Sequence, residues 1–402
     1  MTRAARTLEG EDWSAPRPIY AVWELTLKCD QACRHCGSRA GLARTQELST
    51  QEAFEVGEAL VDLGCRELTV IGGEAYLRPD LDEIVAFMAD RGVRVTMQTG
   101  GRAVDCDMVR RLKRAGLSAI GVSIDGLPEV HDRLRGVPGG FRLATRALDA
   151  GREEGLLVSA NTQINRLNMH QLPELCAELR GHGIVAWQVQ LTVPMGRAAD
   201  RPEWIVQPWE VLDIVETLAD IQRAAAAEPR VKGRPPFNVF AGNNIGYFGP
   251  HELILRSRPG GQPTHWMGCR AGQQVIGIEA DGTVKGCPSL PTAPYVGGNV
   301  RELSLAQIWA EAPELRFARD RTADELWGFC RTCYYADTCR GGCSFTAHST
   351  LGRRGNQPFC WYRADQLRRK GLRERLVHAE RAPGRPFDFG RFELVEEPWP
   401  TG

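Results

Sequence analysis

Ten of the thirteen cysteines in this 402-residue chain fall into two sets with regular spacing. The first set, Cys29, Cys33 and Cys36, has the pattern C-x3-C-x2-C. A cuboidal iron–sulfur cluster takes four ligands, so three thiolates leave one iron free for an exogenous donor. A structural zinc site would need a fourth Cys or His. His35 directly precedes Cys36 and is poorly placed to share its metal, so the spacing favours an open iron–sulfur site over zinc.

The second set lies near the C-terminus and contains seven cysteines in the patterns C-x12-G-x4-C and C-x2-C-x5-C-x3-C, followed by one more: Cys269, Cys287, Cys330, Cys333, Cys339, Cys343 and Cys360. Zinc knuckles are the alternative, because C-x2-C is also a zinc spacing. Seven thiolates do not divide into two sets of four without another donor such as His348, which favours iron–sulfur clusters here too. The remaining cysteines have no such spacing, and we expect structural roles for Cys65, Cys106 and Cys176.

The elements that must position these cysteines form a repeat. Apolar or β-branched runs suited to buried parallel strands occur at 21–27, 67–71, 93–98, 118–124, 156–163 and 184–191. A segment of helical pattern follows each run, near 49–63, 80–91, 105–115, 141–154, 168–181 and 208–228. Six consecutive βα units predict the α/β class and a partial (β/α)6 TIM-like barrel, whose chemistry lies at the carboxyl ends of its strands. The first cysteine set and a GGE sequence both fall there.

The second half of the chain predicts a smaller, cysteine-rich α+β domain. A Pro/Gly-rich stretch marks a boundary, and VIGIEADGTVKGC then predicts a hairpin around Asp281-Gly282. Helices are expected near 304–318 and 362–380. The expected organisation is an N-terminal extension, the barrel, a linker, the cysteine-rich domain and a C-terminal extension, over residues 1–20, 21–235, 236–268, 269–375 and 376–402.

The sequence CDQACRHC after the first strand resembles the signature of the radical S-adenosylmethionine (SAM) superfamily. In that family a [4Fe-4S] cluster binds SAM through its free iron and reduces it to a 5′-deoxyadenosyl radical. IGGEAYLRPDL is similar to the family's GGEP motif, with Ala75 in place of the usual Pro. This resemblance, together with SIDGLPEVHDRLRG and the sixth strand, implies that the SAM-binding residues are Gly72, Gly73, Glu74, Ser123, Asp125 and Gln190.

The seven C-terminal cysteines resemble the SPASM domain, which holds two auxiliary iron–sulfur clusters in a subset of these enzymes. The resemblance implies a proximal cluster on Cys269, Cys287 and Cys343. It implies a distal cluster on four further cysteines, Cys330, Cys333, Cys339 and Cys360. We therefore expect SAM and three clusters, the auxiliary ones also of [4Fe-4S] type. The proximal set is one ligand short, because residues 270–286 contain no cysteine.

Charge and composition exclude several other classes. With 50 Lys+Arg against 50 Asp+Glu, no charge excess attracts nucleic acid or anionic lipid. The chain is 43% hydrophobic and 25% charged, which is ordinary for a globular protein, and it contains no uninterrupted apolar stretch of membrane-spanning length. The first residues, MTRAARTLEGEDW, lack the apolar region of a signal peptide. We expect a cytoplasmic enzyme that binds neither nucleic acid nor membrane.

Among SPASM relatives the commonest substrate is a ribosomally made peptide that is crosslinked, epimerised or oxidised. We expect such a precursor peptide here, with an electron donor such as flavodoxin or ferredoxin. Only 20 residues precede the first strand, too few for the winged-helix recognition domain of many relatives, so a separate recognition protein is expected. Alternatives are oxidation of a small molecule, sulfatase-type maturation, and a non-catalytic electron-transfer protein. No catalytic base is identified.

Overall fold

The computed structural model describes residues 5, 6, 8, 12, 15–229, 235–257 and 262–400. Its first half is built on seven parallel strands: β1 (Tyr20–Glu24), β2 (Glu67–Ile71), β3 (Arg94–Thr99), β4 (Leu117–Ser123), β5 (Leu157–Ile164), β6 (Ala186–Leu191) and β7 (Asn238–Ala241). They lie side by side in chain order. Each of the six strands expected from the sequence is present, with boundaries shifted by at most a few residues.

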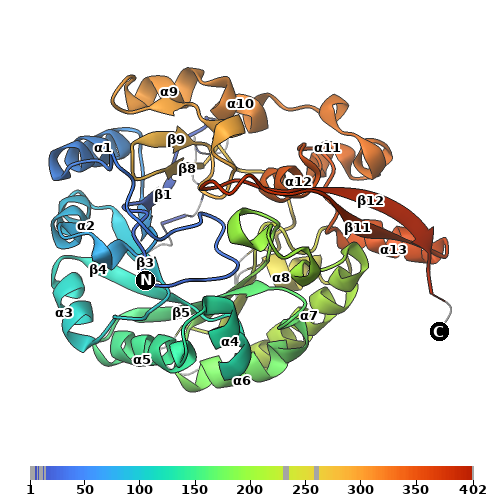
Figure 1. Ribbon diagram of the computed structural model, residues 1–402, viewed down its shortest axis with the longest axis horizontal. Coiled ribbons are helices and arrows are strands. Elements are labelled where there is room, and N and C mark those ends of the chain that lie inside the picture. The colour runs from blue at the N-terminus through green and yellow to red at the C-terminus, as the bar shows by residue number, and fades with distance from the viewer. Residues whose placement is uncertain are drawn as a thin grey trace.

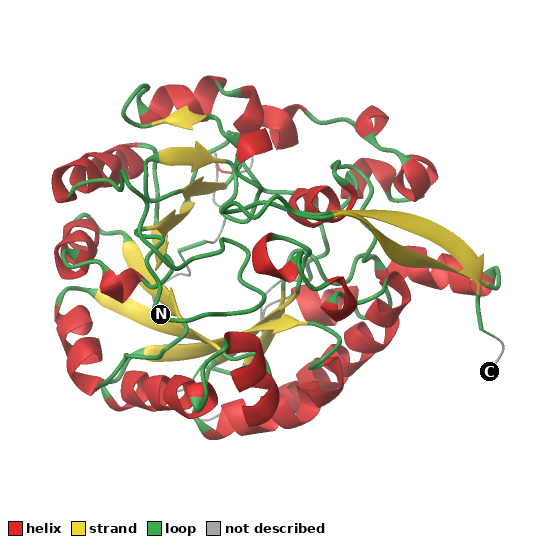
Figure 2. Cartoon of the chain, in the orientation of Figure 1, coloured by secondary structure: helices red, strands yellow, loops and turns green. Residues whose placement is uncertain are grey.

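Helices cover the outer face of this curved sheet (Figures 1 and 2). They are α1 (Thr50–Asp62), α2 (Leu81–Asp90), α3 (Cys106–Arg114), α4 (Pro128–Arg135), α5 (Gly140–Glu153), α6 (Leu172–Gly181) and α7 (Val211–Ala226). The predicted α/β class and partial barrel are confirmed. Only α4 was not expected, because it is short and its eight residues include only two aliphatic ones, Val130 and Leu134. None of the helices in the described ranges is long and apolar enough to span a membrane.

Local signals explain where α1 begins and ends. The Ser49 side chain accepts a hydrogen bond from the Glu52 backbone N–H, and the Glu52 carboxylate accepts one from the backbone of Ser49. This reciprocal capping box satisfies two donors that the helix leaves free. At the other end Gly64 adopts a φ of +87°, the left-handed conformation that glycine takes at little cost.

The interval 236–268, expected as a linker, contains ordered structure. Strand β7 pairs in parallel with β6, and the short helix α8 (Glu252–Arg256) follows it. A four-residue strand between Pro/Gly-rich segments is too short for periodicity to reveal, and only its pairing with β6 identifies it. Residues 258–261 of this interval lie outside the described residues, as does half of the expected N-terminal extension.

The cysteine-rich region continues the same sheet at its other edge. Strand β8 (Val275–Ile278) pairs in parallel with β1, and β9 (Thr283–Lys285) and β10 (Gly298–Asn299) extend it in antiparallel fashion. The β8–β9 turn has positive φ at Gly282 but not at Asp281, and the Gly282 N–H donates to the Glu279 carbonyl. The hairpin expected around Asp281-Gly282 is therefore present, and its strands are joined by a type I turn with a glycine bulge.

Five helices accompany these strands: α9 (Leu305–Glu311), α10 (Pro313–Asp320), α11 (Ala336–Cys339), α12 (Ser344–Leu351) and α13 (Trp361–Arg369). The single helix expected over 304–318 is divided, because Pro313 cannot donate an N–H within a helix and instead starts α10. The helix expected over 362–380 is found only in its first half, as α13, and the prediction for its second half is wrong. Gly371 has a φ of +71°, and the chain turns there into strand β11 (Leu372–Glu380).

The C-terminal extension forms a hairpin. Strand β11 pairs antiparallel with β12 (Arg391–Pro398), and Figure 1 shows this hairpin reaching away from the barrel. Both strands are rich in charged residues, and Arg373 and Arg375 donate to Glu397 across the pair at 2.8 Å. Partners this far apart in sequence are invisible to local pattern analysis.

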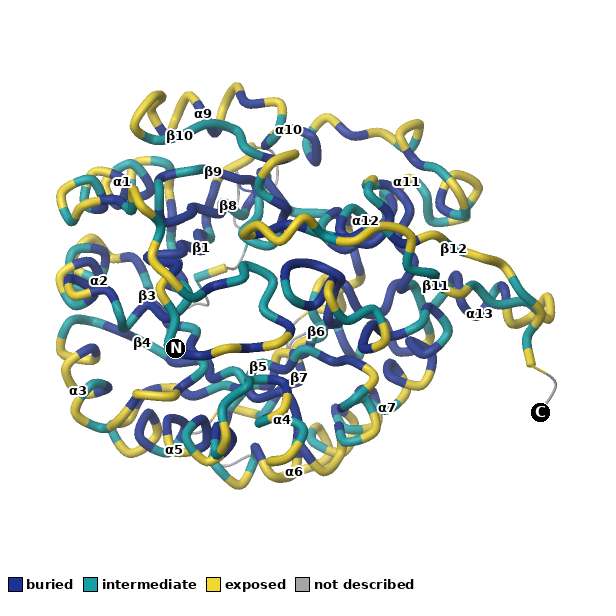
Figure 3. The backbone as a smooth tube through the Cα atoms, in the orientation of Figure 1, coloured by how far each residue is buried: buried dark blue, intermediate teal, exposed yellow. Residues whose placement is uncertain are grey.

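One apolar core extends through both halves of the chain (Figure 3). It includes Trp23 of β1, Trp187 of β6 and Ile276 of β8, each almost fully buried. A second, small cluster packs beside Cys269 and Cys287 and consists of Ala271, Leu290, Tyr295, Phe317 and Ala318. The barrel and the cysteine-rich region are therefore packed together, and the division at the expected boundaries stays a prediction.

Candidate functional site

The first cysteine set lies in the loop that leaves the carboxyl end of β1. Cys33 is buried, whereas Cys29 and Cys36 are half-buried. Burial, together with the charges of Glu74, Cys33 and Cys36, raises the pKa of Cys29 to about 12. Thiolates held this close in a poorly solvated loop repel one another, and bound iron would compensate their charge. The donor set therefore fits an iron–sulfur cluster.

The separation of the sulfur atoms distinguishes a cluster from a single metal ion. Thiolates at about 2.3 Å from one tetrahedral zinc ion lie about 3.8 Å apart. Within the described part of the chain no three cysteine sulfurs all lie within 4.8 Å of one another. The Cys29 sulfur does lie within 4.8 Å of an oxygen each of Asp30 and Glu74, but no three of the described thiols converge as closely as a single zinc ion requires.

A buried ion-pair network holds the cysteine loop against the end of β4. The Asp125 Oδ2 atom lies 2.9 Å from His35 Nε2 and 2.6 Å from an Arg135 nitrogen, and Oδ1 accepts the Gln163 backbone N–H at 2.8 Å. An Arg135 nitrogen also lies 3.6 Å from the Cys33 sulfur. Burial alone would raise the pKa of Asp125, but the charges of Arg135 and His35 hold it below its ordinary value. Both oxygens of the Asp125 carboxylate are therefore bonded to groups of the protein itself. A contact between Asp125 and SAM stays a prediction.

Glu74 follows β2 and is almost completely buried. Its carboxylate accepts hydrogen bonds from Thr99 Oγ1 at 2.6 Å, the Gly100 N–H at 2.7 Å and Gln31 Nε2 at 3.2 Å. Burial raises the pKa of Glu74 to about 7, although the Thr99 and Gly100 bonds act in the opposite direction. A carboxyl group tuned this way becomes more easily ionised when a cation such as an ammonium group binds beside it.

The two glycines before Glu74 are needed by the protein's own backbone. A Cβ on Gly73 would lie 2.0 Å from the Lys28 carbonyl oxygen, and one on Gly72 would lie 2.6 Å from that of Thr26. The Gly73 N–H donates to Thr26 and the Glu74 N–H to Lys28, both at 2.8 Å. The glycines therefore let the end of β2 pack against the start of the cysteine loop.

The remaining expected SAM residues lie at the same edge of the sheet. Ser123 is the last residue of β4 and Gln190 the last but one of β6; both side chains are half-buried. In register they pair with Asn161 and Gln163 of β5, the strand between them. The topology thus gathers these residues at the strand ends where the cysteine loop begins, and their contacts with SAM stay predictions.

The four cysteines expected to hold the distal cluster line a single cavity: Cys330, Cys333, Cys339 and Cys360. Aromatic side chains complete its wall, including Tyr247, Phe248 and Tyr335. Burial, followed by the charge of Cys339, raises the pKa of Cys360 well above its ordinary value. Four converging thiols in an aromatic pocket, one buried and three half-buried, fit a cluster with a complete thiolate set.

The three cysteines expected to hold the proximal cluster also converge. Burial raises the pKa of Cys287 to about 12 and that of Cys343 to about 11, and the second cause in each is the charge of Cys269. No fourth cysteine joins them from the barrel. Cys65 donates to the Glu67 carbonyl, Cys106 to Glu153, and Cys176 is buried on α6.

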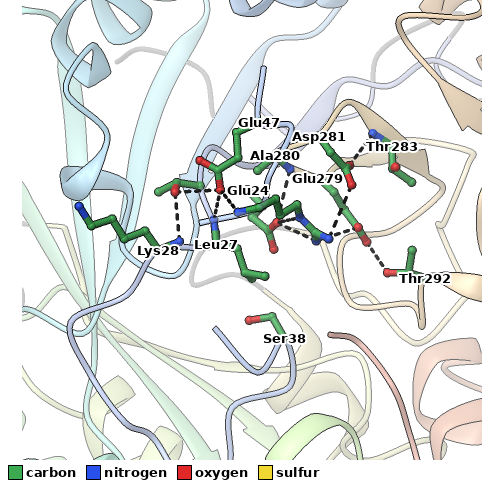
Figure 4. A network of polar contacts seen from close by, with 12 residues as sticks. Glu24, Leu27, Lys28, Ser38, Glu47, Glu279, Ala280, Asp281, Thr283 and Thr292 are labelled. Atoms are coloured by element: carbon green, nitrogen blue, oxygen red, sulfur yellow. Dashed lines mark hydrogen bonds and ion pairs between the residues drawn. The ribbon is translucent and has the colours of Figure 1, made fainter. Parts of the chain in front are cut away.

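A buried polar network links the cysteine loop to the β8–β9 turn (Figure 4). Arg44 Nη2 lies 2.9 Å from both Glu24 of β1 and Glu279 of the turn. Lys285, which has no exposed surface, binds the other Glu279 oxygen at 2.7 Å. The two halves of the molecule are therefore joined by charges as well as by the common core.

Comparison with known proteins agrees with this arrangement. The radical SAM superfamily profile matches residues 23–179, and that of an iron-sulfur cluster-binding domain, SPASM, matches residues 269–334. An AdoMet-dependent heme synthase from Methanosarcina barkeri is 30% identical over 87% of this chain and 97% of its own length. The protein is a radical SAM enzyme with a SPASM domain.

Two further similarities describe its relatives. Mycofactocin maturase MftC from Mycobacterium ulcerans is 30% identical to this radical SAM enzyme over 89% of this chain and 92% of its own length. The crystal structure of Streptococcus suis SuiB bound to precursor peptide SuiA superposes with a TM-score of 0.64 at 17% identity. That superposition covers 82% of this chain and 72% of SuiB, and it supports the fold alone.

Two arginines that hold the radical SAM cysteine loop were not assigned roles from the sequence. Arg135 bridges Cys33 and Asp125, as described above. Arg197 Nε donates to the Cys33 carbonyl at 2.7 Å, and its Nη2 donates to the Ala40 carbonyl at 3.1 Å. The role of Arg197 has no sequence signal, because both of these partners are backbone carbonyls.

Six amide side chains of β1–β7 lie on the face of the sheet that points into the barrel: Gln98, Asn161, Gln163, Gln188, Gln190 and Asn238. Asn161 donates to Gln98, and Gln188 and Gln190 lie in register beside Asn161 and Gln163. Gln188 is exposed to the barrel interior, whereas its neighbours on β6 are buried against the helices. Arg94 is the single lysine or arginine within β1–β7, and it pairs with Glu67 at 3.1 Å.

Proposed function

We propose that this radical SAM enzyme abstracts a hydrogen atom from a ribosomally made peptide, which leads to a crosslink, an epimerisation or an oxidation. The observation that carries the proposal is the amide-lined inner face of the barrel. Each Gln or Asn side chain offers both a donor and an acceptor, as a peptide group does. An extended peptide can therefore exchange its bonds to water for bonds to these amides without leaving a charge unpaired.

The same face is poorly suited to a substrate rich in carboxylates. A buried carboxylate needs a cationic partner, most effectively arginine. Arg94 is already paired with Glu67, and the remaining charged side chain of β1–β7, Glu24, is itself a carboxylate that pairs with Arg44. This charge distribution favours a peptide over a polyanionic small molecule.

The cofactors follow from the cysteine sets. Cys29, Cys33 and Cys36 would hold the SAM-binding cluster, and the SPASM cysteines would hold a proximal and a distal cluster, three in all. When bound, the first cluster would supply the electron for cleavage of SAM to a 5′-deoxyadenosyl radical. The protein contributes position: Asp125 and Arg135 hold the loop, and Glu74 would accept from the SAM ammonium.

A porphyrin-related substrate is the second candidate, favoured by the heme synthase from Methanosarcina barkeri that aligns over 87% of this chain. The mycofactocin maturase aligns at the same 30% identity, so identity alone does not separate the two.

As partners we propose a separate peptide-recognition protein and a flavodoxin or ferredoxin as electron donor.

The test compares two substrates directly. Cluster-loaded enzyme, SAM and dithionite are incubated anaerobically with short peptides encoded beside the gene or with an iron porphyrin carrying propionates. The proposal expects a mass change in a peptide, and transfer of deuterium from the labelled peptide into 5′-deoxyadenosine. Turnover of the porphyrin with inert peptides would overturn it. The Cys29→Ala/Cys33→Ala/Cys36→Ala variant is the control, which should lose SAM cleavage but keep the SPASM iron.

A further inference from the structure

Arg321, which follows α10, is buried without a full set of partners. The residue is 3% exposed, and one nitrogen donates to Ser344 Oγ at 3.2 Å. Its Nε and Nη2 atoms have no hydrogen-bond partner in the described part of the chain. A buried guanidinium with two free donors is costly, because nothing replaces its lost hydration. Such a group indicates a negatively charged partner at this place.

The surroundings of Arg321 identify that partner. Ser344 directly follows Cys343, one of the three proximal cysteines. Burial lowers the pKa of Arg321, and the first opposing cause is the negative charge of Cys269, another of the three. The charge of Glu325 acts more weakly, and no ion pair joins it to Arg321 among the described residues. Arg321 therefore lies close to the proximal cysteines, since it bonds to the residue after Cys343 and the charge of Cys269 acts on it.

The other two cysteine sites differ in one respect. Arg135 lies beside Cys33 but pairs with Asp125 at 2.6 Å. Arg363, whose charge affects Cys330 and Cys360 of the distal site, pairs with Glu374 at 2.6 Å. Each site has a buried arginine, but only at the proximal site does the arginine lack a carboxylate partner within the described ranges.

We propose that Arg321 donates hydrogen bonds to the cluster held by Cys269, Cys287 and Cys343 and raises its reduction potential. The inference rests on the proposed ligand set for that cluster. One-electron reduction adds a negative charge to the cluster, and a cation that is not neutralised by a carboxylate stabilises the reduced form more than the oxidised form. Arg321 is thus a positioning and tuning residue, not a catalytic one.

The experiment is an anaerobic redox titration with dithionite, followed by electron paramagnetic resonance. The parent protein is the Cys29→Ala/Cys33→Ala/Cys36→Ala variant, in which the auxiliary clusters alone contribute. Arg321→Gln removes the charge, and Arg321→Lys keeps it with fewer fixed donors. Arg319→Gln is the matched control: Arg319 lies two residues away, donates to the Gly272 carbonyl, and contacts no cysteine.

For Arg321→Gln we expect the proximal midpoint to fall by at least about 59 mV, which is a tenfold change for one electron. The distal midpoint should not move, and Arg319→Gln should match the parent. An unchanged proximal midpoint in Arg321→Gln overturns the inference. If Arg321→Gln does not retain the cluster, Arg321→Lys decides, because it keeps the charge: we expect it to retain the cluster with a midpoint within about 59 mV of the parent, and loss of the cluster or a larger fall overturns the inference.

The outcome for the parent separates this inference from the function on which it rests. If the parent variant shows two auxiliary-cluster signals in electron paramagnetic resonance, and Cys269→Ala removes one of them, the proposed ligand set is supported whatever the Arg321 variants show. A parent with the distal signal alone would refute the proximal cluster and this inference together. It would leave the proposed peptide substrate to its own test.

Discussion

The Nε2 atom of His35 lies 2.9 Å from the Asp125 carboxylate, and this contact joins the cysteine loop to the end of β4. Both side chains have almost no exposed surface. The Asp125 carboxylate thus orients His35, which lies between Cys33 and Cys36 in the sequence. The same carboxylate pairs with Arg135 and neutralises its charge beside the Cys33 sulfur. The loop that would bind the first cluster is thereby fixed from the opposite side of the site.

The first prediction follows from that contact. Asp125→Asn keeps the size of the side chain but leaves the buried Arg135 charge unpaired. Breaking one partner of a buried pair costs about 3–5 kcal/mol, so we expect a loss of that order in the free energy of unfolding. Denaturant titration measures it. The control Glu58→Gln breaks an exposed pair with Arg91 and should cost less than about 1 kcal/mol. Equal losses of unfolding free energy in the two variants would contradict the role of Asp125 in holding the cysteine loop.

The second prediction concerns the packing of Gly73. Gly73→Ala would place a Cβ at 2.0 Å from the Lys28 carbonyl oxygen, immediately before Cys29. The backbone must shift, so we expect loss of the first cluster and of SAM cleavage, with the SPASM iron retained. Gly181→Ala is the control, because its Cβ would meet nothing within 4 Å. Iron analysis and 5′-deoxyadenosine formation check both; a fully active Gly73→Ala enzyme would refute the packing argument.

The third prediction is a pH dependence of stability that comes from Glu24. Burial raises its pKa to about 7; Arg44 lowers it, and Glu279 raises it further (Figure 4). The folded state therefore binds this proton more tightly than the unfolded state does. Its contribution to the unfolding free energy is complete below pH 4.5 and is lost as pH rises to 7, by up to about 3 kcal/mol.

Glu24→Gln should remove this slope, since its amide does not titrate. The measurement is the difference between wild-type and variant unfolding free energies at several pH values, in which the contributions of other groups cancel. A constant difference from pH 4.5 to 7 would show that Glu24 titrates normally in the folded protein.

The fourth prediction tests the role expected for Glu74. Glu74→Gln keeps the shape but removes the charge that should accept from the SAM ammonium. A hydrogen bond to a charged group is worth about 1.5–3 kcal/mol, so the dissociation constant should rise roughly 10-fold to 150-fold. Glu83→Gln on the exposed face of α2 should leave it unchanged. Equal affinities for wild type and Glu74→Gln, measured on cluster-loaded enzyme, would reject the role.

Much of this architecture can be read from local patterns. The cysteine sets are recognisable because metal ligation requires particular side chains at particular spacings, as between Cys29 and Cys36. The six barrel strands are recognisable because a strand buried on both faces is a continuous apolar run. The Ser49 cap and Gly64 define α1 for the same reason, since the helix ends depend on neighbours a few residues away.

Contacts between distant segments decided the rest. Strand β7 exists through its pairing with β6, and β11 is a strand because β12 lies beside it. The need for Gly73 comes from the Lys28 carbonyl, and the role of Asp125 from His35, 90 residues away. The unpartnered donors of Arg321 are visible only once burial and partners are known. Sequence determines which groups can bind metal, whereas burial and long-range packing determine which charges remain uncompensated beside it.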